Sequence, residues 1–208
     1  MAENEQTVEL FCGPEKPFSS VASFLGYRTI TFDPDPRSGA DVIAAASEAD
    51  PQQFPSAPLM VWMAPPSQGF IDKSGWDWSN YSPITSSATS AENTLRQCLN
   101  LAYQMKATWW FLEVPKSCLR KLPIMAGFNR GYPSRNRYTF KPKDFGGSGR
   151  QDIDVYTNAF WWVPLTQSNG EDSAAVATPS LDDSRAPPFV YLDMLNQFDA
   201  YSRSKGVR

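Results

Sequence analysis

The 208-residue sequence contains no histidine and only three cysteines. The absence of histidine removes the commonest general base of enzymes and the commonest neutral metal ligand. The three cysteines have no paired spacing and no histidine partners, which excludes a zinc site and a disulfide framework. We therefore expect no metal and a reducing compartment such as the cytosol.

Long apolar runs are also missing, because no stretch approaches the length of a membrane span. The acidic amino terminus, Met1-Ala-Glu-Asn-Glu, is unlike a signal peptide. The length suits one α/β core, and the sequence has no visible internal repeat. These features predict a soluble, cytoplasmic protein that makes no membrane contact.

Positive charge is scarce overall, since the formal net charge is −3, but it is concentrated in residues 116–150. Asp144 is the sole acid of that segment, which is rich in aromatic residues and contains the run Gly146-Gly147-Ser148-Gly149. Its cations are Lys116, Arg120, Lys121, Arg130, Arg135, Arg137, Lys141, Lys143 and Arg150. Cations, ring faces and mobile backbone together suit phosphate and base contacts, although a charge run is also typical of a solvated face. The segment therefore predicts a nucleic-acid-facing surface on an otherwise acidic protein.

The first 33 residues have the pattern of a βαβ unit. An apolar run over residues 7–11 ends in Cys12-Gly13, a helix is expected over residues 19–25, and a second strand over residues 27–32 ends at Asp33. In such units the turn after the first strand approaches the ligand, and an acid about twenty residues further on accepts hydrogen bonds from ribose hydroxyls. The pattern predicts a nucleoside ligand; capping of the Asp33-Pro34-Asp35-Pro36 turn is the other interpretation of Asp33.

Further motifs follow in a fixed order. Glu9-Leu-Phe-Cys-Gly13 is followed by Asp41-Val42-Ile43, and the strand at residues 59–64 leads into Pro65-Pro66-Ser67-Gln68. Phe111-Leu112-Glu113-Val114-Pro115 comes next, and then Leu119-Arg120-Lys121-Leu122-Pro123 and Asp154-Val-Tyr-Thr-Asn158. Over residues 7–165 this series resembles the cytosine-5 DNA methyltransferases, especially the short phage-borne type. The resemblance implies a Rossmann-like, class I S-adenosylmethionine-dependent methyltransferase fold, with a mostly parallel sheet and helices on both faces.

The resemblance also implies roles for individual residues. Ser67 stands where the family has its nucleophilic cysteine, Glu113 matches the acid that assists protonation of the ring nitrogen, and Val114 replaces an asparagine. The cofactor-binding positions are Phe11, Gly13, Ser19, Asp33, Asp41 and Pro65. Arg135 and Arg137 join Ser67 and Glu113 as the catalytic positions, because they lie near where the family's basic strand approaches the flipped base and its phosphates. The nucleic-acid positions are Arg120, Lys121, Arg130, Lys141 and Lys143.

Three departures weaken catalysis by the family's mechanism. One is Val114, since the family's asparagine at this position helps hold the loop that carries the nucleophile. A cysteine thiolate adds to a pyrimidine ring at neutral pH, whereas an unassisted serine hydroxyl is a very weak nucleophile. The turn Gly13-Pro14-Glu15-Lys16-Pro17 has one glycine, and its two prolines remove backbone donors near the expected cofactor.

The remaining cysteines and tryptophans have other interpretations. Cys98 is expected on the buried face of a helix over residues 91–106, and Cys118 is a weaker candidate for a relocated nucleophile. An exposed tryptophan of the Trp76-Asp77-Trp78 loop is a candidate base contact.

The sequence divides into residues 1–165, a methyltransferase-like domain; residues 166–188, a polar linker or loop; and residues 189–208, a terminal helix. The helix has an apolar stripe, Phe189, Leu192, Leu195, Phe198 and Tyr201, that either docks on the domain or binds a protein partner.

Two function classes remain open. One is a catalytically impaired methyltransferase-like protein that keeps a cofactor pocket, with S-adenosylmethionine as its ligand, and a surface for DNA or a nucleotide. The other is an active S-adenosylmethionine-dependent enzyme whose target needs no cysteine nucleophile. A purely structural or interaction role is a weaker alternative.

Overall fold

The computed structural model describes residues 6–125, 137–145, 151–164 and 186–206. The strands are β1 (Gln6–Leu10), β2 (Arg28–Phe32), β3 (Met60–Met63), β4 (Trp76–Asp77), β5 (Ser82–Pro83), β6 (Trp109–Pro115), β7 (Arg137–Phe140) and β8 (Ile153–Thr157). The α-helices are α1 (Pro17–Phe24), α2 (Gln68–Ile71), α3 (Ser86–Gln104) and α5 (Pro188–Ser204). Short 3₁₀ helices are η1 (Pro36–Ser38), η2 (Pro51–Gln53), η3 (Lys73–Gly75), η4 (Cys118–Lys121) and η6 (Pro142–Phe145).

Six of the described strands form one sheet in the order β2-β1-β3-β6-β8-β7. The first four are parallel, and β8 runs antiparallel to both of its neighbours. The central strands are mostly apolar because both faces of the sheet are covered; every residue of β3 is apolar and buried. The predicted α/β fold with a mostly parallel sheet is confirmed.

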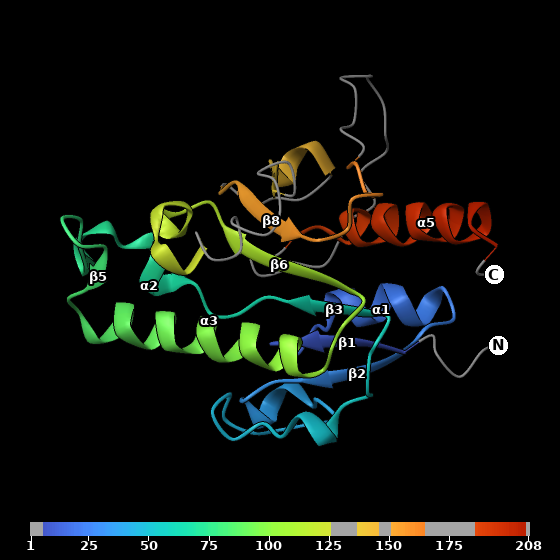
Figure 1. Cartoon of the computed structure of the whole chain (residues 1–208), viewed down its shortest axis with the longest axis horizontal. Helices are drawn as coiled ribbons and strands as arrows, with labels where there is room; N and C mark the ends of the chain where they lie inside the picture. The colour runs from blue at the N-terminus through green and yellow to red at the C-terminus, as the bar shows by residue number, and fades with distance from the viewer. Residues whose placement is uncertain (1–5, 126–136, 146–150, 165–185, 207–208) are drawn as a thin grey trace.

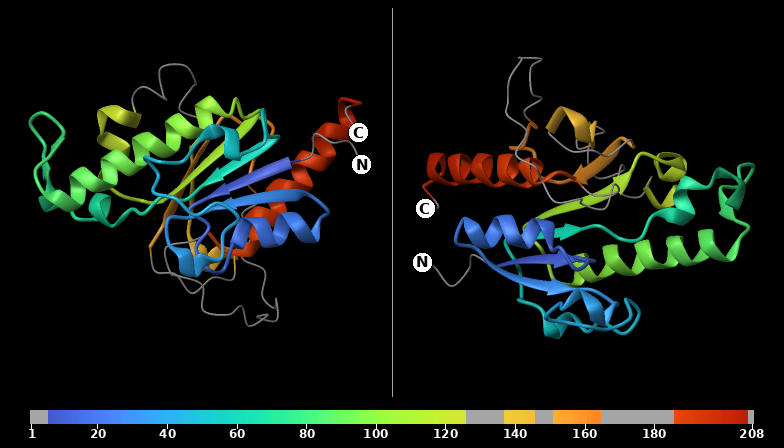
Figure 2. Two further views of the ribbon diagram at one scale, coloured as in Figure 1. Left: turned by 90° about the horizontal axis from the view of Figure 1, so that it is seen from below. Right: turned by 180° about the vertical axis from the view of Figure 1, so that it is seen from behind.

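Helices cover both faces of this sheet, which gives three layers (Figures 1 and 2). On one face α3 presents Ala91, Leu95, Cys98 and Ala102 to the core, at the three- and four-residue spacing of a buried helical stripe. Thr85 begins α3, because its Oγ1 accepts a hydrogen bond from the amide of Ala88. The prediction that Cys98 is a core residue is confirmed.

On the other face α5 packs beside α1, and both helices cover an aromatic core. The stripe predicted for α5 is partly wrong. A three-residue spacing drifts by roughly 60° at each step around an α-helix, so it cannot keep one face. The buried apolar residues follow the helical period: Val190, Tyr191, Met194, Leu195 and Phe198.

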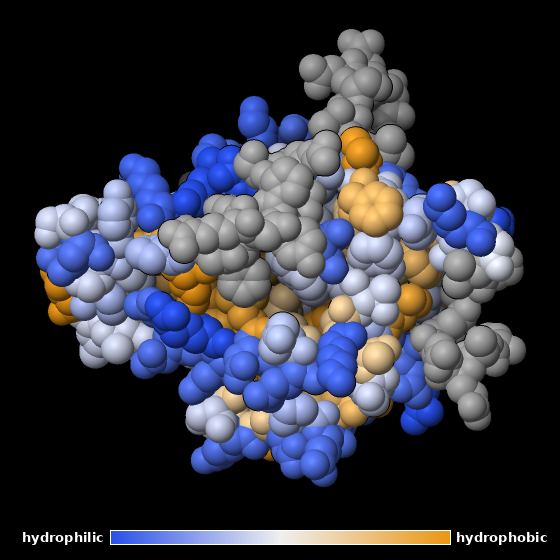
Figure 3. Space-filling model, in the orientation of Figure 1, coloured by the Kyte–Doolittle hydropathy of each residue, from blue (hydrophilic) through white to orange (hydrophobic). Residues whose placement is uncertain are grey.

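Apolar side chains of both α1 and α5 remain outside the core. Phe189 of α5 is 37% exposed and Phe24 of α1 is 85% exposed. With Val21 and Leu192 they line an open apolar groove of about 640 Å³ between the two helices. On the face drawn in Figure 3, hydrophobic surface gathers in a band above α3, and hydrophilic residues cover the elements on either side. No helix in the described part of the chain is both long enough and apolar enough to cross a membrane.

Candidate functional site

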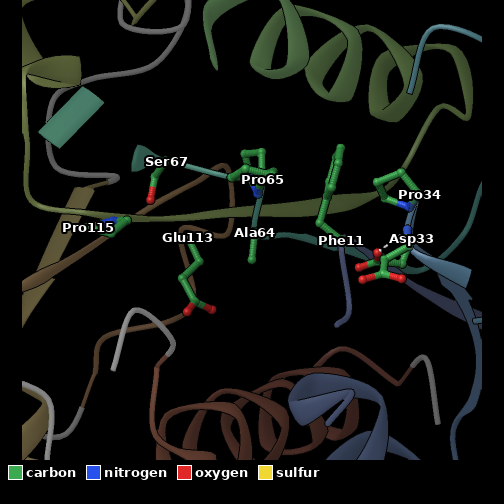
Figure 4. A pocket seen from close by; sticks show the side chains of 10 residues that line it. Phe11, Asp33, Pro34, Ala64, Pro65, Ser67, Glu113 and Pro115 are labelled. Atoms are coloured by element: carbon green, nitrogen blue, oxygen red, sulfur yellow. Dashed lines mark hydrogen bonds between the residues drawn. The ribbon is translucent and has the colours of Figure 1, made fainter. Parts of the chain in front are cut away.

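The carboxyl ends of the parallel strands meet at one edge of the sheet and enclose a pocket of about 330 Å³. This is the edge at which open α/β sheets bind their ligands. The pocket is lined by Phe11, Asp33, Pro34, Asp35, Ala64, Pro65, Pro66, Ser67, Glu113 and Pro115 (Figure 4). The fold therefore brings together the segments that follow β1, β2 and β3 with the end of β6.

Phe11 and Asp33 form one end of this pocket (Figure 4). Phe11 has a positive φ of 62°, and its amide donates to the carbonyl of Phe32 over 2.7 Å, which turns the chain sharply after β1. The buried carboxylate of Asp33 accepts 2.8 Å hydrogen bonds from the amides of Gly13 and Asp35. These bonds connect the turn after β1 to the turn after β2. A carboxylate has about four acceptor positions, so Asp33 can still accept hydrogen bonds from a ligand.

The amino terminus of α1 is occupied by a residue that the sequence did not single out as part of the site. The fully buried carboxylate of Glu9 accepts hydrogen bonds from the amides of Phe18, over 3.3 Å, and Ser19, over 2.8 Å. The Ser19 hydroxyl donates to the carbonyl of Lys16. Ser19 therefore contacts Glu9 and the Lys16 carbonyl at the start of α1, and it does not line the described pocket. An acid inside an apolar strand, two residues before Phe11, was the available signal for Glu9.

Asp41 is placed beside β2 and does not line the described pocket. Its Oδ2 accepts 2.8 Å hydrogen bonds from both the amide and the hydroxyl of Thr31. Burial opposes ionisation, but the Thr31 donors outweigh it and lower the pKa of Asp41. In this structure Asp41 fastens the loop after η1 to β2, where Val42 bridges to Phe32.

Ser67 lies at the other end of the pocket, after the Pro65-Pro66 turn that follows β3. Its carbonyl accepts the amide of Phe70, which begins α2, and its hydroxyl makes no capping hydrogen bond to that helix. The hydroxyl points into the pocket on the side where Glu113 lies (Figure 4). Pro65 lies between Ser67 and Phe11 along the pocket wall (Figure 4).

Glu113 is 2% exposed, and its carboxylate points toward α5 (Figure 4). Oε2 accepts hydrogen bonds from Trp62 Nε1 over 2.7 Å and from the Tyr191 hydroxyl over 2.9 Å. Oε1 accepts the amide of Ala186. Val114, which replaces the family's asparagine, is buried in the core on the opposite face of the sheet.

The basic segment is less cationic than its sequence suggests, because acids from beyond residue 150 pair with it. Lys116 Nζ lies 2.9 Å from Asp152 Oδ2. Arg120 Nε donates to Asp154 Oδ2 over 2.6 Å, and this pair raises the pKa of Arg120. The guanidinium of Arg120 also donates to Thr139.

Other cations of the segment lie at the surface. Lys121, Arg137, Lys141 and Lys143 are exposed. Arg130 and Arg135 lie outside the described residues.

The two tryptophans of the predicted loop differ in exposure. Trp76 is 3% exposed and stacks on Phe70, whereas Trp78 is 38% exposed.

Cys118 lies in the core and not in the pocket. It is 4% exposed, its Sγ donates to the carbonyl of Phe70 over 3.0 Å, and burial raises the pKa of its thiol to about 11. These properties oppose a role as nucleophile. Within the described ranges, no three His, Cys, Asp or Glu side chains converge as metal ligands do.

No protein-family model matches this chain, and no curated protein sequence matches it. Solved structures with a similar fold include a protein provisionally named a DNA modification methyltransferase, encoded within a prophage of E. coli. It is 12% identical with a TM-score of 0.49, and the match covers 73% of this chain and 45% of that one. A methyltransferase from Archaeoglobus fulgidus, described as SAM-dependent, is 11% identical with a TM-score of 0.44, covering 74% and 86% of the two chains. These likenesses concern the fold alone.

Proposed function

We propose that this chain is a methyltransferase-fold protein of the cytosine-5 DNA type that binds S-adenosylmethionine but does not methylate cytosine by covalent catalysis. On this proposal it acts as an accessory nucleic-acid-binding protein. The Phe11 and Asp33 end of the pocket suits the nucleoside of the cofactor, because it offers a ring face and a carboxylate with unused acceptor positions. The Ser67 and Glu113 end would then adjoin the reacting group.

The observation that carries this proposal is that Ser67 occupies the pocket without a base to activate it. The sequence has no histidine. The pocket acid on the side of the Ser67 hydroxyl is Glu113, whose carboxylate already accepts three hydrogen bonds from other groups (Figure 4). A serine hydroxyl needs a positioned base to become a nucleophile. Covalent addition to a pyrimidine therefore has no support from the residues that line this pocket.

Exposed cations support the nucleic-acid part of the proposal. Lys121, Lys141 and Lys143 are exposed and belong to the segment whose resemblance is to the DNA-facing part of the family. Such cations bind phosphates without reading sequence. Replacing the three lysines together by alanine should release DNA that the wild-type protein retains at low salt.

Calorimetry tests cofactor binding, and a methyl-transfer assay on cytosine-containing DNA tests catalysis. We expect wild-type protein to bind S-adenosylmethionine and to transfer no methyl group. Ser67→Cys restores the thiol at the position of the nucleophile, and Ser67→Ala is its matched control. Methylation by Ser67→Cys alone would show that the missing thiol was the limiting change.

Two results would overturn the proposal. Wild-type methyl transfer would favour the active enzyme that needs no cysteine, provided that transfer is lost when Glu113 or Asp33 is replaced. Absence of cofactor binding together with absence of DNA retention at low salt would remove both leading functions and leave an interaction role.

A further inference from the structure

Glu113 connects the pocket to the carboxyl-terminal helix. Two of its three donors, Ala186 and Tyr191, follow it by 73 and 78 residues and belong to the segment that enters and forms α5. The third, Trp62, lies on β3 immediately before the pocket turn. The side chains of Trp62 and Tyr191 are fully buried, so water does not compete for these hydrogen bonds.

The two ring donors are themselves rigidly held. The Trp62 indole is stacked between Phe18 and Phe111, with ring centroids 5.5 Å and 5.1 Å away. Tyr191 packs edge-on against Trp62, with a centroid distance of 4.8 Å and an interplanar angle of 77°. Side chains locked by such packing hold their hydrogen-bond partners more closely than mobile ones do.

The hydrogen bonds also limit what Glu113 can offer to a ligand. A carboxylate has about four acceptor positions, and the described donors occupy three of those of Glu113. Oε2 carries two bonds and Oε1 carries one, so the remaining position is on Oε1. The direction of that position depends on the orientation of the carboxylate, which Trp62 and Tyr191 hold through Oε2.

We propose that Tyr191 and Trp62 are positioning residues that fix the Glu113 carboxylate in the pocket, so that docked α5 is part of the ligand site. This inference rests on the proposed function, because it concerns the same pocket. It predicts that loss of the Tyr191 hydroxyl weakens a ligand that spans both ends of the pocket. A ligand confined to the Phe11 and Asp33 end should be unaffected.

The chain contains a matched control for this hydroxyl. Tyr27 is 3% exposed, and its hydroxyl donates to Asp199 of α5 over 2.6 Å. Tyr191→Phe removes a buried hydrogen bond from a tyrosine of α5 to a carboxylate of β6, and Tyr27→Phe removes a part-buried hydrogen bond from a tyrosine just before β2 to a carboxylate of α5. Only Tyr191→Phe removes a bond to a pocket residue.

The test measures binding of two probes, S-adenosylmethionine and adenosine, to wild type, Tyr191→Phe and Tyr27→Phe by calorimetry, with thermal denaturation of each variant. We expect Tyr191→Phe to weaken binding of S-adenosylmethionine by up to about tenfold, because Glu113 loses one of the three donors that hold its free acceptor position in place, and to change adenosine binding by less than about twofold. Tyr27→Phe should leave both affinities unchanged at a similar loss of thermal stability. Trp62→Phe should act in the same direction as Tyr191→Phe.

The outcomes separate this inference from the proposed function. If wild type binds S-adenosylmethionine and Tyr191→Phe binds it equally well, or loses both probes in parallel, the positioning role is refuted and the cofactor site stands. If wild type binds neither probe, the cofactor site and the positioning role both fall.

Discussion

The pair formed by Arg120 and Asp154 allows a sharp test of whether Arg120 is a structural residue or a free contact for nucleic acid. Asp154 is 1% exposed and Arg120 is 25% exposed. Arg120→Ala would leave the Asp154 carboxylate buried with the Thr139 hydroxyl as a remaining donor. Breaking a buried ion pair by removing one partner costs about 3–5 kcal/mol. Because Arg120 is a quarter exposed and Thr139 remains, we expect the lower end, about 3 kcal/mol.

For a domain of this size a loss of about 3 kcal/mol lowers Tm by roughly 6–12 °C. Thermal and urea denaturation of Arg120→Ala measure the loss, and Lys121→Ala is the matched control, since Lys121 is an exposed neighbour. The control should lie within about 0.5 kcal/mol of wild type. Replacing both partners, as in Arg120→Met with Asp154→Leu, should recover most of the loss. Equal stability of Arg120→Ala and Lys121→Ala would refute the structural role.

Three further predictions concern packing, protonation and the turn below the pocket. An added Cβ on Gly69 would lie 2.5 Å from the carbonyl oxygen of Ser87, so Gly69→Ala should lower the free energy of unfolding, measured by urea denaturation, by about 1–3 kcal/mol. The control is Gly26→Ala, whose added Cβ meets no atom within 4 Å and which should show only the smaller strain of a positive φ. Burial raises the pKa of Cys118 to about 11, so between about pH 9 and 11 the unfolded chain releases a proton that the folded chain keeps. The free energy of unfolding should therefore fall as pH rises through this range, and it should fall less steeply in Cys118→Ala. Glu9→Ala should cost about 2 kcal/mol or more, because two amides of α1 lose their buried acceptor; a loss below about 0.5 kcal/mol would contradict that role.

The elements that sequence predicted well are those whose signal is local. The strands expected over residues 7–11 and 59–64 correspond to β1 and β3, since parallel strands covered on both faces are mostly apolar. The face of α3 that carries Cys98 was expected from its helical spacing. The proximity of Phe11, Asp33 and Ser67 also followed, since the carboxyl ends of parallel strands share one edge.

The features that sequence did not predict depend on partners far away in the chain. Arg120 and Asp154 are 34 positions apart, and Glu113 and Tyr191 are 78 apart. Nothing near Glu113 in sequence indicates that its carboxylate turns toward α5. The stripe of α5 was misjudged for a related reason, since an apolar spacing of three is satisfied by several rotations of the helix, and only its packing against α1 selects one.

These distant pairs change the expected electrostatics of DNA binding, which the salt dependence of affinity can measure. The segment over residues 116–150 has nine cations, and pairing of Lys116 and Arg120 leaves at most seven for phosphates. Each phosphate contact on duplex DNA contributes about −0.9 to the slope of log K against log salt, so the slope should be no steeper than about −6. Lys121→Ala should make it shallower by about one, and Lys116→Ala should leave it unchanged because Asp152 already neutralises that lysine. Fluorescence anisotropy of a labelled duplex between about 50 and 200 mM salt gives the slopes. A wild-type slope near −8, or an equal change in both variants, would mean that the paired cations exchange their acids for phosphates on binding.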